Sequence, residues 1–198
     1  MQRLTIETGS FAVNTTILSV EGCAWIIDPG SDAQRIARLV QDKGLEMGGV
    51  LLTHAHFDHI GAVPELQRIY PSLPVYIHPS DVQVISHPMN QMPPEYPPVS
   101  VFSNILPECP LKGCEVIETP GHTPGGVSYY FAEEKLLLAG DTLFAGSVGR
   151  TDLPGGDMAT LMASLRKLTR LSDDTLVIPG HGAVTTIGEE KAANPFLV

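Results

Sequence analysis

Short apolar runs bounded by glycine, proline and charged residues organise the first half of the chain. Runs of this length and setting predict strands. We expect strands at residues 4–7, 15–20, 23–27, 49–53 and 75–77, with Glu21 and Gly22 as the turn of a hairpin. Apolar residues at helical spacing predict one helix from residue 33 to a stop at Gly44 and a second over residues 62–70.

The second half repeats this order. Apolar runs predict strands at residues 115–118, 127–131, 135–139 and 175–178. Asp157 is placed to cap a helix with Leu161, Leu165 and Leu168 on one face, and a short helix is expected over residues 189–193. Strands followed by a helix, twice, fit an α/β fold of two packed sheets with helices outside. Periodicity alone also allows one doubly wound sheet.

Residues 87–110 interrupt this rhythm with seven prolines, which exclude a regular helix there. A loop this long inside a compact domain tends to serve a function or to be disordered. We expect it to form a wall or lid over a functional site, and an irregular structural connection is the alternative.

Composition and charge exclude several classes of function. The 198 residues suit one domain, and a 43% hydrophobic content supports a sizeable core. With 12 Lys and Arg against 22 Asp and Glu, the net charge is −10, which argues against a nucleic-acid partner. Because no apolar run approaches the roughly 20 residues that span a bilayer, we expect no membrane association. The odd count of three cysteines, and an N-terminus unlike a signal peptide, favour a cytoplasmic protein.

The segment His54-Ala55-His56-Phe57-Asp58-His59 places three imidazoles and one carboxylate directly after an apolar run. These are ligands that zinc and similar divalent metals prefer. An extended chain aims alternate side chains the same way, so His54 and His56 are expected to point together. A solvated histidine-rich loop is the alternative, but the chain holds only seven histidines and three lie here.

Three further residues share this setting at the ends of expected strands. His122, Asp141 and His181 each sit beside glycine or proline, where the backbone can turn sharply and present a side chain at the end of a sheet. Five of the seven histidines therefore occur in one recurring context, which disfavours an ordinary core role for the set.

The motif His-x-His-x-Asp-His, followed by a distant His, a Gly-Asp and a final Gly-His, resembles the metallo-β-lactamase superfamily. The stretches at residues 140–144 and 146–152, and the ending from Ile178 to Leu197, resemble its short, single-domain, glyoxalase II-like branch. The resemblance implies a four-layer αβ/βα sandwich over residues 1–198. It also implies that the C-terminal helical glutathione-binding domain of longer members is missing.

The same resemblance implies a metal centre of two divalent ions, with zinc favoured and iron or manganese as alternatives. It assigns His54, His56 and His122 to the first metal, Asp58, His59 and His181 to the second, and Asp141 to both. A hydroxide bridging the metals is then the nucleophile. Asp58 is expected to orient it as the catalytic residue. Asp28 either holds a ligand histidine in the correct tautomer or simply closes a turn with Pro29 and Gly30.

The implied activity is that of a metal-dependent hydrolase that cleaves S-acyl-glutathione or a related small-molecule thioester. A mononuclear iron persulfide dioxygenase, from a related branch that shares residues 149–152, is the alternative, and a non-catalytic metal-binding module is a third interpretation. Arg150 is expected to bind an anionic group of the substrate. An ion pair with Asp152 or Asp157 is the structural alternative for this arginine.

Overall fold

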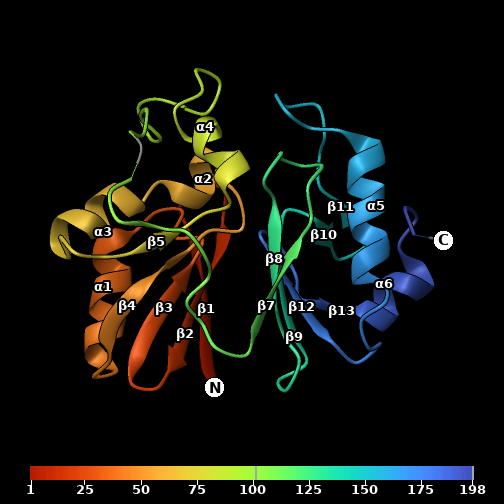
Figure 1. The fold of residues 1–198 in the computed structure, drawn as a ribbon, viewed down its shortest axis with the longest axis horizontal. Helices are drawn as coiled ribbons and strands as arrows, with labels where there is room; N and C mark the ends of the chain where they lie inside the picture. The colour runs from red at the N-terminus through yellow and green to blue at the C-terminus, as the bar shows by residue number, and fades with distance from the viewer. Residues whose placement is uncertain (101, 198) are drawn as a thin grey trace. The chain divides into compact units, whose positions relative to one another are not determined.

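The computed structural model describes residues 1–100 and 102–197 and divides into two compact units, residues 1–110 and 111–198. Each unit contains its own sheet and its own helices (Figure 1). The predicted α/β class is therefore confirmed, whereas one functional domain over residues 1–198 stays a prediction. Among the described residues, no helix has the length and apolar content needed to cross a bilayer.

The first unit is built on a six-stranded sheet. In sheet order its strands are β1 (Gln2–Thr8), β2 (Val13–Val20), β3 (Cys23–Ile27), β4 (Glu46–Leu51), β5 (Val75–Tyr76) and β6 (Ile105–Leu106). The first three pair antiparallel and the last four pair parallel, so β3 belongs to both kinds of ladder. The carboxyl ends of β3, β4 and β5 therefore meet at one edge, where polar residues can gather.

Helices follow the parallel strands of this unit. They are α1 (Ala33–Asp42), α2 (Phe57–Ile60), α3 (Val63–Ile69), the 3-10 turn η1 (Pro79–Asp81) and α4 (Val82–Ile85). The buried face of α1 presents Ile36 and Val40 to one apolar cluster with Ile26, Val50 and Leu66. Burial of these side chains anchors β3 and β4, and so fixes the positions at which both strands end.

The second unit contains a five-stranded sheet. Its strands, in sheet order, are β13 (Thr185–Thr186), β12 (Leu176–Pro179), β9 (Leu136–Gly140), β8 (Val127–Phe131) and β7 (Cys114–Glu118). Strands β9 and β12 pair parallel, so both carboxyl ends lie at the same edge. Helix α5 (Met158–Leu168) begins at Asp157, which accepts a hydrogen bond from the Thr160 N–H as predicted, and it buries Leu161 and Leu165.

Several short elements differ from the sequence-based expectation. The strand expected over residues 49–53 runs from Glu46 to Leu51, because the Thr53 N–H donates to the side chain of Asp28 instead of a strand partner. The last helix, α6, starts at Ile187, where Thr186 and Glu189 form a capping box. Strands β6, β13 and the small hairpin of β10 (Leu143–Phe144) and β11 (Ser147–Val148) were not expected. Each is only two residues long, too short for periodicity to reveal.

The proline-rich stretch is irregular over most of its length, and none of its described residues is helical. Near its end, however, Ile105 and Leu106 form β6 and complete the sheet of the first unit, so the whole of residues 87–110 is not a loop. The expectation that it covers the functional site stays a prediction.

Candidate metal centre

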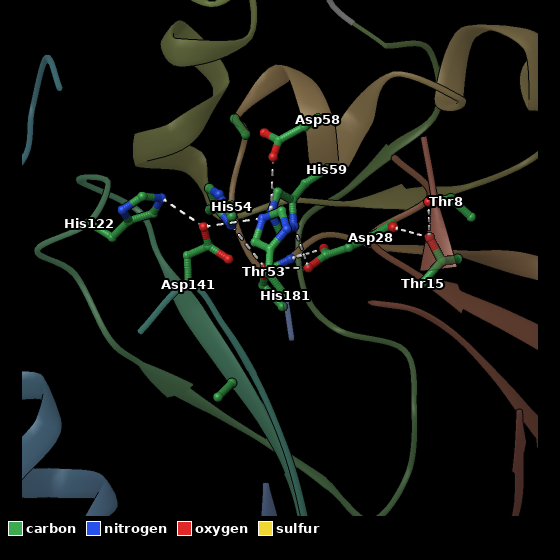
Figure 2. Close-up of polar contacts among 12 residues, drawn as sticks. Thr8, Thr15, Asp28, Thr53, His54, Asp58, His59, His122, Asp141 and His181 are labelled. Atoms are coloured by element: carbon green, nitrogen blue, oxygen red, sulfur yellow. Dashed lines mark hydrogen bonds and ion pairs between the residues drawn. The ribbon is translucent and has the colours of Figure 1, made fainter. Parts of the chain in front are cut away.

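The histidine-rich segment lies at the carboxyl edge of the first sheet, immediately after β4. His54, His56, Asp58 and His59 are each at most 9% exposed. His56 is extended, and α2 then begins, so that Asp58 and His59 occupy its first turn. The rings of His54 and His56 lie 4.9 Å apart, and those of His54 and His59 lie 4.0 Å apart. The four sequence-predicted residues of this unit are therefore brought together, and Figure 2 shows His54, Asp58 and His59 among them.

Asp28, at the end of β3, forms the polar centre of this half. Its Oδ1 accepts the Thr53 N–H at 2.7 Å, and its Oδ2 accepts the Thr53 hydroxyl at 2.6 Å and His59 Nδ1 at 3.0 Å. The residue is 2% exposed and adopts a left-handed φ of 48°, which Asp tolerates better than most residues. Asp28 therefore turns the chain and also contacts the ring of His59, while the role of this histidine as a metal ligand stays a prediction.

These hydrogen bonds determine which ring nitrogens carry protons. The carboxylate of Asp28 can only accept, so His59 donates from Nδ1. The single hydroxyl proton of Thr53 goes to Asp28, so its oxygen accepts from His54 Nδ1 at 3.1 Å. In both rings Nε2 is therefore the nitrogen with a lone pair for a metal. Both Asp28 oxygens accept hydrogen bonds, so in this structure Asp28 is the hydrogen-bond partner of Thr53 and His59.

The second unit brings together the other three candidates at the carboxyl ends of β9 and β12. Asp141 follows β9 and His181 follows β12, and the Gly180 N–H donates to the Gly140 carbonyl at 2.8 Å between these neighbouring ends. His122 lies in the loop between β7 and β8 and donates from Nδ1 to the backbone carbonyl of Arg150 at 2.7 Å. Its Nε2 is then the ring nitrogen that carries the lone pair.

One oxygen of Asp141 faces two imidazoles. Its Oδ2 lies 3.5 Å from His122 Nε2 and 3.6 Å from His181 Nε2 (Figure 2). In the first unit, Asp58 Oδ2 lies 3.9 Å from His59 Nε2. Two ligand atoms bound tetrahedrally to one zinc ion at about 2.1 Å are separated by about 3.4 Å. The donor types and spacings within each unit therefore fit ligands that share a cation.

Two glycines permit close packing beneath the ligand-bearing loops, one in each unit. A Cβ atom at Gly30 would lie 1.9 Å from the backbone oxygen of Asp58, and one at Gly149 would lie 1.9 Å from that of Asp141. Both contacts involve backbone, which cannot move aside as a flexible side chain could. Glycine is therefore required at both positions for Asp58 and Asp141 to occupy their places.

Arg150 supplies its carbonyl to His122, while its side chain is exposed and pairs with Asp152. Nε and Nη2 each donate to one carboxylate oxygen at 2.7 Å. Hydrogen bonding to Arg150 lowers the pKa of Asp152 from its usual 3.8 to about 2. The structural alternative for Arg150 is thus present with Asp152 as partner, and substrate binding by this arginine stays a prediction.

Sequence reasoning missed three residues that support the first half of the site. Thr53 links Asp28 to His54, while Asp81 and Asn90 contact the backbone of the histidine segment. For Thr53, its place directly before His54 was an available signal. Asp81 and Asn90 offered no such signal, because their common partner Ala55 lies 26 and 35 residues away from them in the sequence.

Comparison with known proteins places this geometry in a family. The sequence profile described as Metallo-beta-lactamase superfamily matches residues 8–181. The chain is 37% identical to hydroxyacylglutathione hydrolase GloC of Haemophilus influenzae, over 97% of this chain and 96% of that protein.

Two crystal structures are similar over nearly their whole length. The BLEG-1 B3 metallo-beta-lactamase has 37% identity and a TM-score of 0.87, and each chain is covered to 99%. TTHA1623, in a di-iron-bound form, has 39% identity and a TM-score of 0.89, with 98% of this chain and 100% of that chain covered. The fold inferred from the histidine and aspartate motifs is confirmed, and the chain belongs to the metallo-beta-lactamase superfamily.

Proposed function

We propose that the protein is a thioester hydrolase with a centre of two divalent metal ions. His54, His56 and His122 are assigned to one ion, Asp58, His59 and His181 to the other, and Asp141 to both. The observation that carries this proposal is the single Asp141 oxygen that faces Nε2 of both His122 and His181. A shared carboxylate offsets the repulsion between two neighbouring cations. Zinc suits these ligands, and iron or manganese would also fit.

A centre of this kind supplies hydroxide at neutral pH and polarises a carbonyl group. The protein's own residues hold the imidazole rings in one tautomer and orient the nucleophile. Asp28 and Thr53 keep the protons of His54 and His59 on Nδ1, and the Arg150 carbonyl does the same for His122. The carboxylate of Asp58 is proposed to accept a hydrogen bond from the attacking nucleophile and so to orient it.

The substrate is proposed to be a small-molecule thioester, with S-acyl-glutathione as the first candidate. Two considerations support it: the glyoxalase II-like motifs at residues 140–144 and 146–152, and the 37% identity to a hydroxyacylglutathione hydrolase. The net charge of −10 disfavours a polyanionic substrate.

The test combines metal analysis with product analysis. Metal-replete protein is expected to contain two ions per chain and to release thiol from lactoylglutathione without oxygen. Oxygen uptake on glutathione persulfide, with one iron per chain and no thioester cleavage, would instead establish the dioxygenase alternative. Hydrolysis of a β-lactam in place of the thioester would keep the metal centre but reject the proposed substrate.

Substitution of Arg150 by glutamine is expected to raise KM for an anionic thioester by about tenfold while kcat stays unchanged. The reason is that the variant loses a charged hydrogen bond that would stabilise the bound substrate and the transition state equally. The arginine must leave Asp152 to bind substrate, and their exposed pair is weak enough to permit this. In the same variant, a carboxyl NMR titration should show the pKa of Asp152 returning from about 2 toward 3.8. An unchanged KM together with the restored pKa would limit Arg150 to the ion pair.

A further inference from the structure

Two buried side chains outside the proposed ligand set hold the backbone of the histidine segment. The Ala55 N–H donates to Asp81 Oδ2 at 2.9 Å, and the Ala55 carbonyl accepts from Asn90 Nδ2 at 2.8 Å. The Phe57 N–H donates to Asn90 Oδ1 at 2.8 Å. Ala55 and Phe57 are the residues that alternate with the proposed ligands His54, His56 and Asp58 along the chain.

Asn90 is fully engaged in this contact. Its Nδ2 also donates to the carbonyl of Ile85 at 3.2 Å, and the side chain is only 5% exposed. The amide therefore ties the start of the proline-rich stretch and the end of α4 to two points on the ligand segment. An aspartate could not reproduce this arrangement, because it cannot donate to the Ala55 carbonyl.

We propose that Asn90 is a positioning residue for the metal centre. By fixing the Ala55 carbonyl and the Phe57 N–H, it sets the direction of the backbone on both sides of His56 and immediately before Asp58. Asp81 fixes the remaining polar group of Ala55. The inference rests on the proposed metal binding, because it concerns the residues assigned as ligands.

A matched control exists in the same unit. Gln67 forms a similar set of bonds far from the ligand segment: its Nε2 donates to the carbonyls of Leu73 at 3.1 Å and Ser103 at 2.7 Å, and its Oε1 accepts the Ser103 N–H at 3.3 Å. Gln67→Ala therefore removes an amide with three backbone partners without touching the histidine segment. It reports what the loss of such an amide does to stability alone.

The experiment compares wild type, Asn90→Ala and Gln67→Ala by three measurements: unfolding of the metal-free chain, Zn²⁺ affinity by chelator competition, and the absorption spectrum of the Co²⁺-loaded protein. Both variants are expected to unfold more readily than wild type. Only Asn90→Ala should bind Zn²⁺ more weakly, by about 10- to 100-fold as for other groups that orient metal ligands, and change the Co²⁺ spectrum.

Equal Zn²⁺ affinity and identical spectra for wild type and Asn90→Ala would overturn the positioning role while the proposed function stands. Failure of wild type to bind metal would overturn the proposed function itself. Asn90→Asp keeps an acceptor for the Phe57 N–H and removes the donor to the carbonyls of Ala55 and Ile85. It is expected to show the same loss of affinity and provides the comparison if the alanine variant does not fold.

Discussion

Replacement of Asp28 by asparagine is expected to lower metal affinity by about 10- to 100-fold and to destabilise the fold by about 1–3 kcal/mol. Asp28 accepts three hydrogen bonds, from the Thr53 N–H, the Thr53 hydroxyl and His59 Nδ1. An amide cannot accept on both sides. If its oxygen stays near the Thr53 N–H, its NH₂ group faces His59 Nδ1. His59 must then accept at Nδ1 and carry its proton on Nε2, the nitrogen needed for the metal.

This change of tautomer is directly measurable. Nitrogen NMR of the metal-free protein should show His59 protonated at Nδ1 in wild type and at Nε2 in Asp28→Asn, and chelator competition gives the affinity. Asp42→Asn, on the exposed end of α1, makes the same chemical change in the same unit away from the site and should alter neither property. A variant that binds metal as tightly as wild type would remove Asp28 from the support of the metal centre.

Replacement of Asp58 by asparagine is expected to lower kcat for thioester cleavage by about 10²- to 10⁴-fold, the range associated with a positioned acid–base group. The amide has the size of the carboxylate but lacks its charge. It binds a divalent ion less well and cannot accept a proton from the nucleophile. Asp58 is 9% exposed, so bulk water is a poor substitute for the missing carboxylate.

Loss of metal and loss of orientation can be separated in this variant. Activity and metal content are measured together across a titration of Zn²⁺. Restoration of full activity once two ions are bound would show that Asp58 serves only as a ligand. A persistent deficit at two ions per chain supports its role in orienting the nucleophile, and unchanged kcat at every metal concentration contradicts both roles.

The sequence predicted the parts of this structure that depend on local chemistry. His54, His56 and Asp58 were expected to lie together because imidazole and carboxylate side chains crowd the end of one apolar run, and His122, Asp141 and His181 because each joins an apolar run to a tight turn; their binding of metal stays a prediction. The longer helices were also predictable, since α1 and α5 each bury one face at regular spacing. These features need only neighbours in the chain to specify them.

The remaining features depend on partners distant in sequence. The contact of Asn90 with Ala55 spans 35 residues, and that of Asp28 with Thr53 spans 25. No periodicity or motif links such residues before the chain folds. For Arg150, the sequence allowed both an ion pair and a substrate contact, and the structure shows the pair with Asp152. The two-residue strands β6 and β13 form by pairing with β5 and β12, which lie elsewhere in the sequence.

Gly30 lies against the backbone of Asp58, and Gly149 lies against that of Asp141. These contacts limit which mutations the protein can accept near its proposed metal centre during evolution. Each glycine touches the backbone of a residue assigned to the metals, so even the smallest side chain there displaces a ligand. A mutation at either glycine therefore cannot change substrate preference without also displacing a residue of the proposed metal centre. The exposed side chain of Arg150 is not subject to this constraint, so a substitution there changes the proposed substrate contact and leaves the backbone of Asp58 and Asp141 in place.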